Sequence, residues 1–130
     1  MFFRKDISDR DKIMKLKKIK SCGIIFKIRK INPLDHVTGA KVMVAIHDKY
    51  RKIKEQDTDV EVSDTDLKKV KSHYRDVFMA SVVKPQLSRK KDDGLKIFVD
   101  DIIQNWDLAI DLYEQINLLT YGKKKIQKFF

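Results

Sequence analysis

The chain has 130 residues, of which 42% are hydrophobic and 37% are charged, with a formal net charge of +10 and one cysteine. This length fits a single domain with a modest core, although the charged fraction exceeds the usual quarter. A single cysteine excludes an internal disulfide and a cysteine-based metal cluster, and no apolar run approaches the ~18 residues of a membrane span. Because residues 1–6 lack the features of a signal peptide, the sequence predicts a soluble cytosolic protein.

The excess positive charge is concentrated at the two ends of the chain. Residues 1–31 carry eleven Lys/Arg and three Asp, and residues 123–130 carry four lysines and no acid. We therefore expect a basic N-terminal extension over residues 1–14, one globular domain over 15–122 and a basic C-terminal tail over 123–130. Basic ends could bind an acidic partner or a nucleic acid, but they are equally well explained by solubility.

The first predicted element is a β-hairpin. Apolar side chains alternate along residues 24–28, which is the pattern of a half-buried strand. Together with a turn at Ser21-Cys22-Gly23, this strand predicts a hairpin over about residues 15–31. Apolar residues at helical spacing make a helix over residues 12–20 the alternative.

A helix is predicted directly after the hairpin, over about residues 33–53. Asn32 is a favoured N-cap, and Pro33 suits the first helical position. Gly39 is a point at which this helix could divide into two pieces, 34–38 and 41–54. The expected buried face has a spacing of three to four residues: Val42 or Met43, Ile46, Tyr50 and Ile53.

The second predicted helix is the clearest element in the sequence. It begins at a cap formed by Ser63 or Asp64 and continues to Val83, before Pro85 stops it. Its expected buried face comprises Leu67, Val70, Tyr74, Val77, Phe78 and Ser81. A polar, basic loop over residues 86–94 follows, and then a short apolar segment that is capped by Asp100 and Asp101.

The last helix is predicted over residues 105–121, with Gly122 in the usual C-terminal position. Its expected inner face comprises Trp106, Ala109, Ile110, Tyr113, Ile116, Leu119 and Thr120. Together these elements predict a mostly helical α+β fold, in which a β-hairpin is followed by a small bundle of about three main helices.

The sequence contains few candidates for catalysis or metal binding. Three histidines lie far apart and are each best explained as surface residues: His36, His47 and His73. Cys22 has no group that would orient a base for it, and the adjacent acids at 92–93 and 100–101 point apart from each other. The sequence therefore predicts a non-enzymatic protein without catalytic residues, cofactor or metal.

Three short motifs occur in a distinctive order. Arg29-Lys30-Ile31-Asn32-Pro33-Leu34-Asp35 leads from a basic strand into a helix, Phe78–Pro85 ends the central helix, and Ile97–Ile102 precedes the last helix. This order, over about residues 15–122, resembles that of the small tail assembly chaperones of long-tailed bacteriophages. The resemblance implies binding without chemistry: such a protein keeps the long, largely helical tape measure protein soluble while tail tube subunits assemble around it.

The resemblance implies a tape measure or tail tube protein as partner, with the host cytoplasm or the virion as location. A groove between helix faces could hold an amphipathic partner helix. The candidate partner-binding residues are the cations of the strand, of the loop and of the tail: Lys27, Arg29, Lys30, Arg89, Lys90, Lys91, Lys123, Lys124 and Lys125. The alternative function is that of a nucleic-acid-binding or virion structural protein that uses its basic ends.

Overall fold

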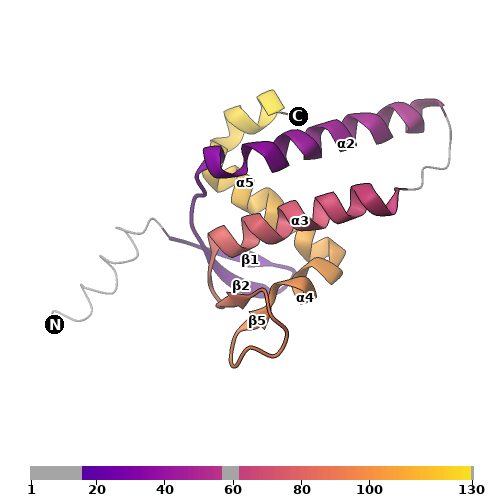
Figure 1. The fold of residues 1–130 in the computed structure, drawn as a ribbon. Coiled ribbons are helices and arrows are strands. Elements are labelled where there is room, and N and C mark those ends of the chain that lie inside the picture. Colours follow the sequence, from indigo (N-terminus) through magenta and orange to yellow (C-terminus); the bar gives the residue numbers. More distant parts are fainter. Residues whose placement is uncertain (1–15, 57–61, 130) are drawn as a thin grey trace.

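A β-hairpin opens the part of the chain that the computed structural model describes, residues 16–56 and 62–129 (Figure 1). Strand β1 (Lys17–Ser21) pairs antiparallel with β2 (Ile24–Ile28). Cys22 and Gly23 between them have positive φ angles of 49° and 83°, as a tight two-residue hairpin turn requires. The predicted hairpin is confirmed, and the helical alternative is wrong for residues 17–20. The predicted N-terminal extension, residues 1–14, lies outside the described residues.

A third strand, β3 (Val82–Lys84), pairs antiparallel with β2, so the sheet order is β1-β2-β3. The sequence predicts helix as far as Val83, but α3 (Asp64–Ser81) ends earlier because Ser81 is bonded to the end of the hairpin. The Arg29 N–H donates to the Ser81 carbonyl at 3.0 Å, and Ser81 Oγ donates to the Arg29 carbonyl at 2.6 Å. Long-range pairing thus ends a helix whose local pattern continues.

Two helical elements follow the hairpin: a short 3-10 helix, η1 (Pro33–His36), and α2 (Val37–Gln56). The predicted cap is confirmed, because the Asn32 side chain accepts a hydrogen bond from the Leu34 N–H at 3.1 Å. The predicted division at Gly39 is wrong. The 3-10 turn gives way to the α-helix at Val37, and Gly39 lies inside α2.

Between α3 and the last helix, the chain forms a parallel pair, β4 (Leu87–Ser88) and β5 (Ile97–Phe98), and the short helix α4 (Val99–Gln104). The sequence does not predict α4, and the predicted acidic cap at Asp100 and Asp101 is wrong, since both lie in the first turn of α4, whose N-cap is Phe98. Asp100 instead accepts a hydrogen bond from Arg75 Nε of α3 at 2.7 Å, an ion pair that links the two helices.

The last helix, α5 (Trp106–Phe129), carries two apolar stripes, one of which is exposed or half-buried and comprises Trp106, Ile110 and Leu118. Leu108, Leu112 and Ile116 are buried at 3%, 0% and 0% exposure. The expected inner face is correct at Ala109 and Ile116 but wrong at Trp106, which is 39% exposed. Because both stripes are apolar, the sequence does not decide which one enters the core.

Gly122 interrupts the helical backbone of α5 with a φ of 74° and a ψ of 166°. The predicted helix end at this residue is therefore confirmed. The predicted basic tail, residues 123–130, continues as a further helical segment as far as Phe129.

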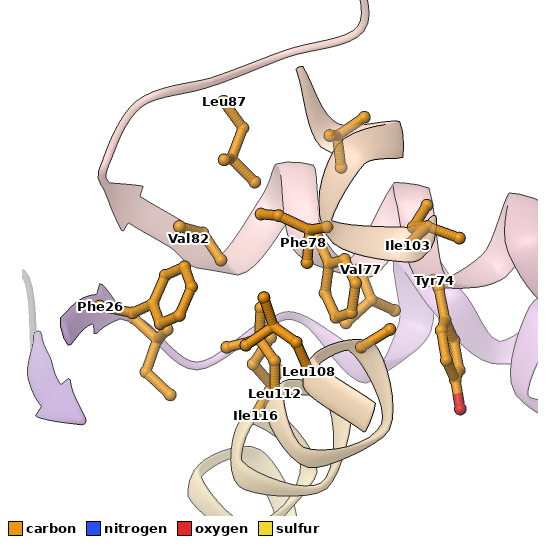
Figure 2. Packing of buried hydrophobic residues seen from close by; sticks show 14 of the residues in the cluster. Phe26, Tyr74, Val77, Phe78, Val82, Leu87, Ile103, Leu108, Leu112 and Ile116 are labelled. Atoms are coloured by element: carbon orange, nitrogen blue, oxygen red, sulfur yellow. The ribbon is translucent and has the colours of Figure 1, made fainter. Parts of the chain in front are cut away.

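The core lies between the sheet, α3, α4 and α5. Figure 2 shows Phe26 of β2, Phe78 of α3 and Leu112 of α5 within one cluster of buried hydrophobic side chains. The least exposed large side chains come from all of these layers: Phe26, Ile28, Val77, Phe78, Val99, Leu112 and Ile116. The predicted α+β class, with a hairpin followed by about three main helices, is confirmed.

Substitution of Phe78 tests this core. Phe78 is 0% exposed, so we expect Phe78→Ala to lower the free energy of unfolding by about 3–5 kcal/mol in urea denaturation. The matched control is Leu95→Ala, at a fully exposed side chain, which should change it by less than about 0.5 kcal/mol. Trp106→Ala should cost less than Phe78→Ala, and a loss below about 1 kcal/mol at Phe78 would contradict the packing.

Candidate functional site: a groove between α2 and α5

Helix α2 contacts the rest of the fold through apolar side chains that are only partly buried. It runs beside α3 (Figure 1), yet none of its side chains over residues 37–52 is fully buried. Met43 and Ile46 pack against the core while only partly buried. The predicted buried stripe is therefore half-buried at Met43, Ile46 and Tyr50, and the side chain of Ile53 lies outside what the structure describes. Space remains between α2 and α5.

Two adjoining cavities occupy this space. The smaller one, of about 110 Å³, reaches Ile31 and Val77, and the larger one, of about 620 Å³, lies beside Trp106 and Leu118. Both are lined by the same four side chains of α2 and α5: Met43, His47, Tyr113 and Asn117. The two cavities therefore form one continuous feature, which we name the α2–α5 groove.

The larger cavity is lined by a stack of aromatic rings. Tyr74 of α3 lies between Trp106 and Tyr113 of α5, with ring centroids 5.5 Å and 4.4 Å apart and interplanar angles of 20° and 26°. In Figure 2 the Tyr74 hydroxyl points away from the buried aliphatic cluster. Burial raises the pKa of Tyr74 above its usual value, so this ring presents a neutral surface at ordinary pH.

Exposed apolar side chains lie on the rims of the groove, beside the charged residues Asp48, Arg51 and Glu114. Val44 on α2 and Trp106 and Leu118 on α5 are 37%, 39% and 37% exposed, and all three line the two cavities. Exposed apolar side chains around a cavity mark binding surfaces in soluble proteins, and Trp and Tyr contribute most to such contacts. The groove is thus a surface suited to an apolar ligand or to the apolar face of a partner.

All three histidines line the smaller cavity, although they are scattered in the sequence. The expectation of a surface residue is wrong for His73, which is 6% exposed and places Nε2 2.8 Å from the Tyr113 hydroxyl. Burial lowers the pKa of His73, and the nearby His36 lowers it further. At neutral pH the cavity wall is therefore uncharged at this residue. Among the described residues, no group of three His, Cys, Asp or Glu could hold a metal ion.

Gly39 allows α2 to approach His73 closely. A Cβ atom at this position would overlap Nδ1 of the His73 ring. Glycine inside a helix costs about 0.5–1 kcal/mol relative to alanine, so a helical glycine needs a structural reason. The reason here is contact between the start of α2 and the middle of α3.

The other end of α2 is fixed by Asp66 in the first turn of α3. The Asp66 carboxylate accepts hydrogen bonds from Lys49 Nζ at 2.9 Å and from the Tyr50 hydroxyl at 2.8 Å. These two donors lower the pKa of Asp66 to about 2. Of the two predicted caps, Ser63 is the one that caps α3, since its Oγ accepts from the Asp66 N–H at 3.2 Å. Helix α2 is therefore anchored to α3 near both ends.

The basic residues predicted to bind a partner do not line this groove. Arg29 Nε donates to the Ala80 carbonyl at 2.8 Å, and Arg89 forms an ion pair with Asp76 at 2.9 Å. Of the other predicted partner-binding residues that the structure describes, Lys27 is half-buried on β2. Lys30, Lys90 and Lys91 are exposed. The side chains of Lys123, Lys124 and Lys125 lie outside what the structure describes.

Sequence reasoning missed the groove because its residues fit a simpler interpretation. The helical spacing of Trp106, Ile110 and Tyr113 predicts core positions for all three. The available signal was the width of the apolar surface of α5, which exceeds what one buried stripe needs.

The chain was compared with protein-family models, curated proteins and solved structures, and none of the three comparisons gives a match. Over residues 16–56 and 62–129, no helix has both the length and the apolar character needed to cross a membrane.

Replacement of Gly39 tests the contact between α2 and α3. We expect Gly39→Ala to lower the free energy of unfolding by about 1–3 kcal/mol, because the added methyl group overlaps the His73 ring. In the double variant with His73→Ala, the two losses should be less than additive in urea denaturation. If Gly39→Ala instead stabilised the protein, as helix propensity alone would predict, the close contact would be refuted.

The buried histidine makes stability depend on pH. The pKa of His73 is lower in the folded protein than in the unfolded chain, so the unfolded chain binds a proton first as the pH falls. We expect the free energy of unfolding to decrease as the pH falls below about 6.5. A further decrease should begin near pH 4, where the unfolded chain but not the folded state protonates Asp66.

Two glutamine variants separate the contribution of His73 from that of other histidines. In urea denaturation between about pH 7.5 and pH 5, His73→Gln should reduce the pH dependence. His47→Gln, at an exposed ring on the same groove, should leave it unchanged. Equal pH dependence in wild type and His73→Gln would show that His73 is not the group responsible.

Proposed function

We propose that this protein is a non-enzymatic assembly chaperone that binds an amphipathic helix of its partner in the α2–α5 groove. The observation that carries the proposal is the aromatic stack of Tyr74, Trp106 and Tyr113, which lines a large cavity with exposed apolar rims. The order of the sequence motifs makes the specific proposal a phage tail assembly chaperone, with the tape measure protein as partner and the tail tube protein as the other candidate.

The shape of the groove supports a helical partner. Two helices that are separated by an apolar gap can accept the apolar face of a third helix, whose anchoring side chains recur every three or four residues. Trp106, Ile110 and Leu118 lie on one ridge of α5, at spacings of four and eight residues, and Glu114 occupies the position between Ile110 and Leu118. Such a ridge can pack against the apolar face of an amphipathic helix, with Glu114 facing a polar position of that helix. A long helical partner would offer many such segments.

The attachment of α2 supports reversible binding. Helix α2 forms one wall of the groove and has no fully buried side chain over residues 37–52. Its distance from α5 can therefore change at a small cost in packing. Modest affinity at each segment, repeated along an extended partner, would hold that partner strongly while still allowing tail subunits to displace the chaperone. The proposed place of action is the cytoplasm of the infected bacterial cell, with the virion as the alternative destination.

A second candidate function is that of a nucleic-acid-binding or virion structural protein. The sequence motivates it through its basic ends, and the lysines on the three-stranded sheet favour the nucleic-acid form of it. This function would use the sheet rather than the groove.

Recovery of the partner through the groove tests the proposal. Tagged protein would be recovered at low and moderate salt from cells that are assembling phage tails, and its partners identified by mass spectrometry. We expect the tape measure protein with the wild type and much less of it with Leu118→Asp, because a carboxylate on the rim opposes burial of an apolar helix face.

Leu95→Asp is the matched control, since it introduces the same charge at a fully exposed leucine outside the groove. It should recover as much tape measure protein as the wild type. Equal recovery by the Leu118→Asp and Leu95→Asp variants would remove the groove from the proposal. Recovery of nucleic acid alone would remove the chaperone function.

A further inference from the structure

The two walls of the α2–α5 groove differ in charge. On the α2 wall, Asp48 and Arg51 line the smaller cavity and form an ion pair with each other at 3.5 Å, so their charges offset. On the α5 wall, Glu114 lines the larger cavity with an exposed side chain, and it makes no hydrogen bond or ion pair with another residue that the structure describes. With the histidines neutral, the groove lining thus carries one uncompensated charge, and it is negative.

A second carboxylate borders the same wall. Asp107 is exposed and lies seven residues before Glu114, which is two turns or about 10 Å along α5, so both carboxylates are on one side of the helix. Asp107 also has no hydrogen bond or ion pair with a described residue. Residues 99–122 contain no Lys or Arg that could offset these charges. The α5 wall is therefore an apolar ridge with two carboxylates along its border.

Covering the groove changes the surroundings of Glu114. The pKa of Tyr74 is raised mainly by burial, and the charges of Tyr113 and Glu114 add to the effect, so this carboxylate lies close enough to the aromatic stack to act on it. A partner that packs on the stack removes water from Glu114 as well. A carboxylate that loses its water without gaining a cation destabilises the complex.

We propose that the α2–α5 groove selects a cationic amphipathic helix, one whose apolar stripe is bordered by Lys or Arg. The inference rests on the proposed function and specifies the chemistry of the partner. Two cations seven residues apart on the partner pair with Asp107 and Glu114, and apolar residues between them contact the ridge of α5. Charged pairs that border an apolar seam set partner choice and orientation in coiled coils in the same way.

Lysine and arginine suit this border in two respects. Their stems are apolar and can lie over the exposed ring of Trp106 while the charged group reaches a carboxylate. A cation over an indole ring is also attracted by the ring itself. A helix bordered by Glu is repelled by Asp107 and Glu114, and one bordered by uncharged residues leaves Glu114 covered and unpaired.

Binding of two synthetic peptides tests the proposal. Both peptides carry the same leucine stripe and no tryptophan, and they differ only in the residues that border the stripe, lysine in one and glutamate in the other. Affinities are measured by anisotropy of a fluorescein label at about 0.15 M salt, where charges more than about 8 Å apart are largely screened. Trp106, the one tryptophan of the chain, lines the larger cavity, so its fluorescence reports whether a peptide enters the groove.

We expect the wild type to bind the lysine peptide at least about fivefold more tightly than the glutamate peptide, or about twofold for each of two partly exposed ion pairs. The net charge of +10 favours the opposite order, so it cannot produce this preference. Asp107→Asn with Glu114→Gln should remove the preference, and Asp107→Lys with Glu114→Lys should reverse it.

The matched control carries Asp92→Asn and Asp101→Asn, which remove the same charge from exposed positions that line none of the cavities described. It should keep the wild-type preference. An equal change in the control would assign the effect to net charge and overturn the inference.

The remaining outcomes separate this inference from the proposed function. If the wild type bound both peptides equally or preferred the glutamate peptide, with a change in Trp106 fluorescence, the cationic partner would be refuted and the groove function would stand. An unchanged preference in the variant with Asp107→Asn and Glu114→Gln would have the same meaning. If neither peptide bound, or if binding left Trp106 fluorescence unchanged, the groove function and this inference would both be refuted.

Discussion

The packing of the end of α3 against the hairpin is the constraint on which the rest of the fold depends. Phe78 and Phe26 are 0% and 1% exposed, and the reciprocal hydrogen bonds between Ser81 and Arg29 fix the strand β3 beside β2. Once α3 and the sheet are joined, their common face must be covered. The stripe of Leu112 and Ile116 on α5 covers it. Because this stripe faces the core, Trp106 on the other stripe of α5 lies toward the surface.

The α2–α5 groove results from this orientation of α5 and from the way in which α2 contacts α3. Helix α2 is held near its ends, through Gly39 against His73 and through Tyr50 on Asp66, and contributes only half-buried side chains between them. The second apolar stripe of α5 therefore faces a gap and not a fully packed neighbour. A surface of this kind arises when a helix has more apolar area than its own fold can bury.

The two proposed surfaces differ in charge and lie on different elements. Residues 99–122, which include most of α5, contain five acidic residues and no Lys or Arg, whereas the three strands of the sheet contain lysines and no acid. An acidic helix repels a phosphate backbone, and a flat sheet offers no groove for a helix. The groove and the sheet of this small domain therefore differ in charge as well as in position.

The sequence by itself determined the elements whose signals are local. The Cys22-Gly23 turn, the Asn32 and Ser63 caps and the break at Gly122 are each set by the conformational preferences of a few neighbouring residues. Tertiary structure alone decided that α3 stops at Ser81, that three distant histidines share one cavity and that Trp106 is exposed. These features depend on strand pairing and on competition between two apolar stripes for one core, and neither is encoded in the spacing of residues along a single element.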